Sequence, residues 1–293
     1  MKKIKIVAPS SYIPGLDFSG SQKIVNFFNS LNYDVEFGKF SFNKHYFFAG
    51  NDSERLSDLE NAFKDKNVDF IVALRGGAGS LHLLDKLDYK MISKYPKPFF
   101  GISDCTALQN ALYAKAKLPS YTGFYAKEVM EKLSSLTKQT LLKCLKNEKQ
   151  IFKVSFLSSG KFSGIMLGGN MRLFVSLLGT PYFPDVKDKI LILEEIGEAP
   201  FQIDNMFMQL KLAGVFDKIK GLILGDFSHV GNLKDEKILN DLIKEYFKNM
   251  PYPVARFKKY SHEKGHVVIP LGGMVHMDSK KGIIILDKLK KMN

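Results

Sequence analysis

The sequence has 293 residues, of which 45% are hydrophobic and 25% are charged, and its formal net charge is +13. The length fits one large domain or two modest ones, and the composition is that of a globular protein with a sizeable core. The basic residues are mostly scattered lysines, with no arginine-rich helix and no aromatic RNA-binding signature, so we expect no nucleic-acid partner.

The sequence indicates a cytoplasmic protein without a membrane span. The apolar run Ile4–Ala8 is interrupted by Lys5 and ended by Pro9, which does not fit a signal peptide. No stretch approaches the roughly 18 apolar residues of a transmembrane helix. Two cysteines, Cys105 and Cys144, do not make a disulfide framework and fit a reducing compartment.

The first part of the sequence alternates apolar runs with helical patterns. Strands are predicted at residues 4–8, 70–74 and 98–102, and helices at residues 21–31, 52–66, 81–87 and 106–117. Ser80 is placed to cap the helix 81–87. This alternation is typical of an α/β domain with a parallel, doubly wound sheet, which we assign to residues 1–126.

The pattern changes after a lysine- and glutamate-rich, helix-prone segment. We interpret residues 127–160 as a helical linker and residues 161–293 as a smaller, β-rich C-terminal domain. Strands are predicted at residues 151–156, 161–167, 190–193 and 221–224, helices at residues 200–212 and 235–247, and a strand-like tail at residues 267–286.

Ser103 is a candidate nucleophile. It lies where an apolar strand ends and a helix begins, so the first N–H groups of the helix are near enough to bind a developing oxyanion. The context resembles a nucleophile elbow, although the G-x-S-x-G pattern is absent. From spacing alone, helix capping by Ser103 or Asp104 is favoured over a nucleophile.

Two further segments combine unusual residues with strand ends. The glycine-rich loop Arg75–Gly79 follows a buried strand, and its N–H groups are free to approach a ligand, although a structural turn explains it as well. The loop matches neither a Walker A sequence nor G-x-G-x-x-G. The acidic residues Glu194, Glu195 and Glu198 follow an apolar strand, and either a functional carboxylate or a solvated loop accounts for them.

Residues His262–His266 match H-E-x-x-H, a zinc-peptidase motif that requires a helix. Pro251 and Pro253 precede the segment and Gly265 interrupts it, so a helix is not expected. We therefore expect no metal, and keep a zinc peptidase using His262 and His266 as an alternative. A Rossmann-like module that binds an anionic ligand without catalysis is a second alternative.

Taken together and in order, several segments resemble the LD-carboxypeptidases, a serine peptidase family that includes both muropeptide-recycling enzymes and microcin C immunity peptidases. The matching segments are residues 7–10 (VAPS), 73–80 (ALRGGAGS), 97–108 (KPFFGISDCTAL), 168–170 (GGN), 178–181 (LGTP), 193–204 (LEEIGEAPFQID), 209–214 (QLKLAG), 221–225 (GLILG) and 265–272 (GHVVIPLG). The resemblance spans nearly the whole chain. It implies a Rossmann-like N-terminal domain, a β-rich C-terminal domain, a homodimer and no cofactor.

The resemblance also implies roles for individual residues. The family's serine, glutamate and histidine fall on Ser103, Glu194 and His266, the histidine being taken from the Gly-His pair before Ile269–Gly272. The oxyanion hole falls on the N–H groups of Gly77 and Asp104. We expect substrate contacts from Arg75, Gly76 and Asn170, with the Arg75 guanidinium a candidate for holding a terminal carboxylate.

The implied reaction is release of the terminal D-Ala from a murein tetrapeptide by an acyl-enzyme mechanism. A microcin-immunity peptidase acting on aminoacyl-adenylate analogues is the alternative within the family. Such an enzyme is expected to stack adenine on an aromatic residue, often a tryptophan, and this chain has none. The sequence departs from the family at Ser120–Phe124, which lacks a T-H-G-P-like segment, and at Ala78, where an aromatic residue is common.

Overall fold

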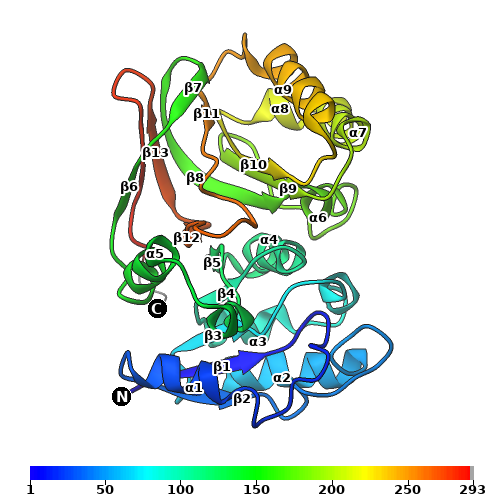
Figure 1. Cartoon of the computed structure of the whole chain (residues 1–293), viewed down its shortest axis with the longest axis vertical. Helices are drawn as coiled ribbons and strands as arrows, with labels where there is room; N and C mark the ends of the chain where they lie inside the picture. Colours follow the sequence, from blue (N-terminus) through cyan, green and yellow to red (C-terminus); the bar gives the residue numbers. More distant parts are fainter. Residues whose placement is uncertain (291–293) are drawn as a thin grey trace. The chain divides into compact units, whose positions relative to one another are not determined.

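The computed structural model describes residues 1–290, which divide into two compact units, Met1–Leu133 and Ser134–Lys290. The first unit includes η2 (Ala126–Glu131), and the second begins with α5 (Ser135–Leu145), so the lysine- and glutamate-rich segment contributes to both units. Each unit has its own sheet (Figure 1).

The first unit is built on a parallel sheet with the strand order β5-β4-β3-β1-β2. Its strands are β1 (Lys2–Val7), β2 (Tyr33–Phe37), β3 (Phe70–Ala73), β4 (Phe99–Gly101) and β5 (Ser120–Thr122). Its helices are α1 (Gln22–Asn29), α2 (Asp52–Lys64), α3 (Tyr89–Lys94) and α4 (Cys105–Ala116). The predicted parallel α/β domain is confirmed, and the loops after β1, β3 and β4 leave the sheet at the same edge.

One predicted helix of this unit is wrong. Residues 81–87 form only the short 3₁₀ helix η1 (Ser80–Leu83) followed by turns. Ser80 does not cap it, because its hydroxyl instead donates a hydrogen bond to the carbonyl oxygen of Asp104 at 2.6 Å. The hydrogen bond to Asp104, which is distant in sequence, has replaced the expected local cap of the helix.

The second unit contains a mixed sheet that curves nearly into a barrel (Figure 1). Its order is β6-β14-β13-β8-β9-β10-β11-β7. The strands are β6 (Gln150–Lys153), β7 (Ser155–Ser158), β8 (Lys161–Asn170), β9 (Ile190–Ile196), β10 (Gly221–Ser228), β11 (Val254–Arg256), β13 (Met274–Asp278) and β14 (Ile283–Leu286), and β12 (Ile269–Leu271) is a further short strand of the chain. The β-rich C-terminal region is confirmed.

Helices cover the part of this sheet in which β8, β9, β10 and β11 run parallel. They are α6 (Met171–Val175), α7 (Pro200–Leu212), α8 (Val215–Lys218) and α9 (Leu233–Phe247). Pro200 occupies the first turn of α7, where its missing N–H costs no hydrogen bond. Because parallel strands end at a common edge, the carboxyl ends of β8 and β9 bring Asn170 beside Glu194.

Candidate active site

The turn between β4 and α4 holds Ser103 in a left-handed backbone conformation, with φ of +63°. This region is unfavourable for a residue with a Cβ and costs on the order of 1–3 kcal/mol. Strain of this kind persists only where the surrounding structure imposes it, and it clusters at functional sites. Ser103 therefore lies at a strained strand-to-helix turn, as the nucleophile interpretation requires.

The glycine-rich loop after β3 packs against this turn. A Cβ placed on Gly76 would lie 3.0 Å from the Cβ of Ser103 and 3.4 Å from its Oγ. Gly77 has a φ of +114°, and a Cβ there would lie 2.4 Å from the Oγ of Ser11. A side chain at Gly77 is excluded and one at Gly76 would be crowded, so the backbone of this loop comes close to the Ser103 hydroxyl.

Asp104 ties three loops of the first unit together. Its buried carboxylate accepts hydrogen bonds from the Ser10 hydroxyl at 2.6 Å and from the Ser80 N–H at 2.8 Å. Its side chain makes no capping hydrogen bond to α4. The capping interpretation of Asp104 is therefore wrong, and the residue instead fixes the loops after β1 and β3 relative to the Ser103 turn.

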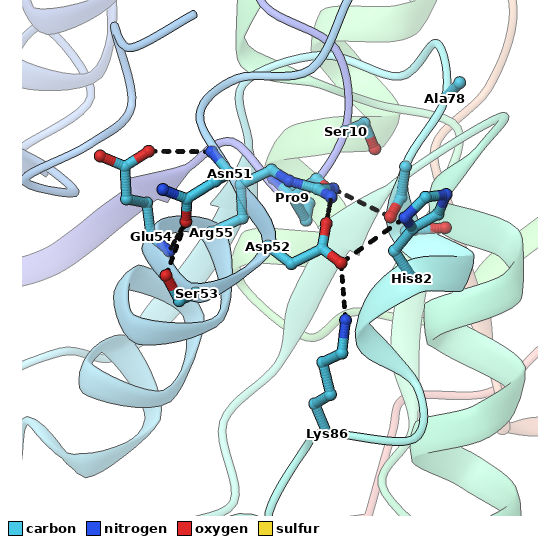
Figure 2. Close-up of polar contacts among 12 residues, drawn as sticks. Pro9, Ser10, Asn51, Asp52, Ser53, Glu54, Arg55, Ala78, His82 and Lys86 are labelled. Atoms are coloured by element: carbon cyan, nitrogen blue, oxygen red, sulfur yellow. Dashed lines mark hydrogen bonds and ion pairs between the residues drawn. The ribbon is translucent and has the colours of Figure 1, made fainter. Parts of the chain in front are cut away.

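A buried arginine on α2 binds the backbone of the loops after β1 and β3 (Figure 2). The side chain of Arg55 on α2 is fully buried, and its Nη1 donates to the carbonyl oxygens of Pro9 at 2.5 Å and Gly79 at 2.8 Å. Its Nη2 donates to Asp52, and its guanidinium stacks 4.7 Å from the ring centroid of Phe48. We did not single out Arg55 in the sequence, because an arginine in a polar helix is ordinarily solvent-exposed.

Arg75 also takes part in the support of the loops. Its Nη1 donates to the carbonyl oxygen of Tyr12 at 2.9 Å, and the Ala78 N–H in the same glycine-rich loop donates to the Ser11 hydroxyl at 3.0 Å. Arg75 is only partly buried. One of its donors thus holds the loop after β1, and a guanidinium carries others for a ligand.

In the second unit, the neighbouring carboxylates of β9 have different surroundings. Glu194 is fully buried, and its Oε2 lies 2.7 Å from Nδ1 of His262. Glu195 accepts hydrogen bonds from the Asn170 side chain and the Arg172 N–H, each at 2.8 Å. Because successive strand side chains point to opposite faces, the two carboxylates serve separate sites.

Asn170 is a structural partner of Glu195. Its Oδ1 accepts a hydrogen bond from the Leu173 N–H at 3.2 Å and so caps α6, while its Nδ2 contacts Glu195. Burial raises the pKa of Glu195 above its usual range, against hydrogen bonds from Asn170, Ile196 and Arg172 that lower it.

His262 has the arrangement of a general base, because a carboxylate orients Nδ1 and Nε2 is left to accept a proton. Its Nδ1 faces the Glu194 carboxylate, so the ionised pair places a proton on Nδ1 and leaves Nε2 as the acceptor in the neutral ring. Burial lowers the pKa of His262, but the hydrogen bond and charge of Glu194 outweigh it and raise the pKa above the ordinary 6.5. Within residues 1–290, the buried Nε2 has no hydrogen-bond partner.

His266 has a different environment. Its Nδ1 lies 2.9 Å from the carbonyl oxygen of Glu263, which only accepts, so Nδ1 must carry the proton. Its own carbonyl oxygen accepts a hydrogen bond from the Thr137 hydroxyl at 2.8 Å. The Glu194 carboxylate thus has a histidine contact at His262, whereas the sequence interpretation expected one at His266.

The H-E-x-x-H match does not have the geometry of a zinc motif. Residues 261–265 form bends and turns rather than a helix, so the two imidazoles do not share one helical face. Among residues 1–290, no group of three or more His, Cys, Asp or Glu side chains is arranged to hold a metal ion. In the same part of the chain, no helix is long and apolar enough to cross a membrane.

Similarity to known protein families assigns the chain to a class of enzyme. The sequence profile of the LD-carboxypeptidase N-terminal domain matches residues 4–123, and that of the LD-carboxypeptidase C-terminal domain matches residues 163–277. The chain belongs to the LD-carboxypeptidase family.

Among named relatives, the chain is similar to a probable murein peptide carboxypeptidase of Bacillus subtilis. The two are 30% identical over 89% of this chain and 85% of the relative. A muramoyltetrapeptide carboxypeptidase from Oxalobacter formigenes has a similar structure, with a TM-score of 0.88 and 30% identity over 99% of each chain. An MccF-like protein from Bacillus anthracis also has a TM-score of 0.88, with 26% identity over 98% of this chain and 97% of that one.

Proposed function

We propose that the chain is a serine-type L,D-carboxypeptidase that releases the terminal D-Ala from murein tetrapeptides. The observation that carries the proposal is the left-handed backbone of Ser103 at a strand-to-helix turn, against which a glycine-rich loop packs. Family membership and similarity to proteins named as murein peptide carboxypeptidases support the substrate class.

In the proposed mechanism, the Ser103 Oγ attacks the carbonyl carbon of the scissile bond while a histidine takes the hydroxyl proton. The N–H groups of Gly77 and Asp104 stabilise the oxyanion, and loss of one such donor costs about 3–4 kcal/mol of activation free energy. The histidine then gives its proton to the departing amine of D-Ala. Water hydrolyses the resulting ester and restores the Ser103 hydroxyl.

We propose His262 as this histidine, in the role that the sequence interpretation gave to His266. Glu194 orients Nδ1 of His262 and stabilises the imidazolium that forms during proton transfer. The buried Nε2 is then the atom that accepts the proton. His266 remains the competing assignment, and separate substitution of the two histidines decides between them.

A carboxypeptidase must also bind a free carboxylate. Arg75 is the proposed anchor, because its loop follows directly on the strand next to β4 and its guanidinium keeps donors beyond the one bound to Tyr12. Gly76 and Asn170 remain proposed contacts, Gly76 through its backbone. We further propose a cytoplasmic homodimer that takes peptides released from the cell wall and needs no cofactor.

The alternative activity is that of the microcin-immunity branch, to which the chain is also similar. The microcin C7 self-immunity protein MccF of Escherichia coli is 25% identical over 90% of this chain and 87% of that protein. The absence of tryptophan disfavours this alternative, because an adenine ring is expected to stack on an aromatic residue.

The test is mass spectrometry of purified protein with four peptides: the free tetrapeptide, the pentapeptide, a tetrapeptide ending in L-Ala and a tetrapeptide with an amidated terminus. D-Ala should be released from the first peptide only, and the Ser103→Ala variant should release none. Efficient cleavage of the amidated peptide, or of the pentapeptide's terminal bond, contradicts the proposal.

A further inference from the structure

A serine, a histidine and an aspartate of the second unit are joined in one row of hydrogen bonds. Ser163 lies on β8, His276 on β13, and Asp287 directly after β14. The Nδ1 of His276 lies 2.7 Å from the Oγ of Ser163, and its Nε2 lies 2.9 Å from the Oδ2 of Asp287. The mechanism proposed above uses none of these side chains.

The antiparallel pairing of the strands explains why the three residues meet. Ser163 and His276 are direct cross-strand partners on β8 and β13, so their side chains project from the same face of the sheet. The N–H of Asp287 donates to the carbonyl oxygen of Met274 at 3.0 Å, which extends the pairing of β13 with β14 by one residue. The backbone of the sheet, rather than a loop, therefore sets the spacing of the row.

The carboxylate determines which nitrogen of His276 is the acceptor. The ionised Asp287 side chain only accepts, so Nε2 carries the proton and Nδ1 is left to accept the proton of the Ser163 hydroxyl. The hydrogen bond from His276, together with Lys149 at 3.3 Å, holds the pKa of Asp287 below its usual range against the effect of burial. Nucleophile, base and orienting carboxylate are thus related as in a serine hydrolase, with the two imidazole nitrogens exchanged.

The row is accessible from solvent. Ser163 is exposed, and the side chains of His276 and Asp287 are 36% and 34% exposed. Next to His276 on the same face lies Ile285 of β14, followed by its partner Ile151 of β6, which is also exposed. A reagent with a short apolar acyl group therefore meets both a hydroxyl and an apolar surface.

A positive charge lies close to the serine in the same strand. Lys161 precedes Ser163 by two residues on β8, so the two side chains project from the same face. The Lys161 side chain is 76% exposed, and its ammonium lies 3.8 Å from Asp278. An ammonium on a flexible chain stabilises the negative oxygen that forms when an ester carbonyl is attacked, although less well than fixed backbone donors do. We therefore expect slow acylation.

We propose that Ser163 is a second nucleophile, separate from Ser103, that accepts acyl groups from esters of short apolar carboxylic acids. The Ser163 Oγ attacks the ester carbonyl carbon while its proton passes to Nδ1 of His276. The bond between this carbon and the alcohol oxygen then breaks, and the alcohol leaves with that proton. Water hydrolyses the acyl-serine, which releases the carboxylic acid and restores the Ser163 hydroxyl.

The experiment treats the Ser103→Ala protein with p-nitrophenyl acetate, so that the proposed peptidase nucleophile is absent. Absorbance follows the release of nitrophenolate, and mass spectrometry of peptides identifies the acetylated residue. Ser163 should be acetylated, and addition of His276→Gln should slow this reaction by about a hundredfold or more, the contribution of a general base. Asp287→Asn should slow it by about tenfold or more, because the carboxylate no longer fixes the tautomer. The matched control is Ser155→Ala, at an exposed serine of β7, which should leave the rate unchanged.

The outcomes decide the proposal without reference to D-Ala release. Acetylation of Ser163 no faster than that of Ser155, or an unchanged rate in a folded His276→Gln variant, overturns it. If circular dichroism shows that His276→Gln does not fold, Asp287→Asn provides the same test, and an unchanged rate there overturns the proposal. Ser163→Ala in the otherwise wild-type chain should leave D-Ala release unchanged, and its loss in a folded variant overturns the separation of the two nucleophiles.

Discussion

The Oε2 atom of Glu194 lies 2.7 Å from Nδ1 of His262, and the carboxylate is fully buried. A buried carboxylate in this position fixes both the tautomer and the orientation of the imidazole. The next residue of β9, Glu195, contacts Asn170 and Arg172 instead. The acidic run therefore contains one carboxylate suited to catalysis and one that holds a helix end.

The pairing predicts unequal effects of substituting the two histidines. His262→Ala should lower kcat by about 10⁴ or more, because Glu194 loses the group it orients. His266→Ala should leave kcat within about tenfold, because its Nδ1 contacts the backbone oxygen of Glu263. Steady-state D-Ala release and circular dichroism of both variants provide the measurement. If His266→Ala lost its activity and His262→Ala kept it, the assignment of His262 as the proton acceptor would be wrong.

The two glutamates should be distinguishable by activity and stability. Ser103→Ala should abolish measurable turnover, and Glu194→Gln should lower kcat by about 10³–10⁴ with little effect on KM. Glu195→Gln should mainly weaken the cap of α6 and lower the free energy of unfolding by about 1–2 kcal/mol. Urea titration and kinetics of the same preparations test this. If Glu194→Gln kept its kcat and Glu195→Gln lost most of it, the roles assigned to the two glutamates would have to be exchanged.

The raised pKa of His262 gives a pH signature. Only the neutral imidazole accepts the Ser103 proton, so the acidic limb of kcat/KM should fall above pH 6.5. In Glu194→Gln the residual activity should show a limb at lower pH, because the stabilising charge is gone. The stability that the Glu194–His262 pair contributes has the opposite dependence, since it is fully present below the unfolded pKa near 6.5 and is lost as pH rises through the folded pKa. If the acidic limb of the pH profile stayed at the same pH in Glu194→Gln, the proposed role of the Glu194–His262 pair would be contradicted.

Chelation and thiol reagents should have no effect on activity. Activity should survive EDTA, because the proposed nucleophile is a serine hydroxyl and residues 261–265 do not form the helix of a zinc motif. Cys105 lies two residues from Ser103, but burial raises the pKa of its thiol to about 12, so little thiolate forms. The assay is D-Ala release after incubation with EDTA or iodoacetamide, with Ser103→Ala as the inactive control. Loss of activity with EDTA that zinc restores contradicts serine catalysis.

Arg55 should matter for both stability and turnover, although it lies behind the loops. Arg55→Met removes the donors to Pro9 and Gly79 and should lower the free energy of unfolding by about 3 kcal/mol. Displacement of the glycine-rich loop should lower kcat more than it raises KM. Lys64→Met, on the exposed end of the same helix, is the control. Unchanged kcat in a folded Arg55→Met variant means that the loop does not depend on this support.

The sequence predicted the elements whose patterns are strong and local. The buried run Phe70–Ala73 and the strand-to-helix step at Ser103 identify a parallel α/β unit and its candidate nucleophile. We predicted strands from continuous apolar runs, which missed β2, whose sequence YDVEF alternates apolar and charged residues as a half-buried strand does, and β5, which has only three residues.

The partners of the candidate site depend on long-range contacts that no local pattern encodes. His262 and Glu194 are 68 residues apart, and the path of the loop after β11 brings His262 to the carboxylate. A Gly-His pair before a proline drew attention to His266, and that signal contains nothing about the path of the loop. Arg55 likewise becomes a buried support only because the loops after β1 and β3 close over α2.

The left-handed backbone at Ser103 has a consequence for selection. Glycine adopts this conformation without a steric penalty, so Ser103→Gly should relax the turn and make the folded chain more stable while removing the hydroxyl. The substitution that most readily stabilises this turn therefore also removes the proposed nucleophile. A search for heat-resistant variants by stability alone would be drawn toward inactive protein at this position, and only a parallel screen for turnover would keep the serine.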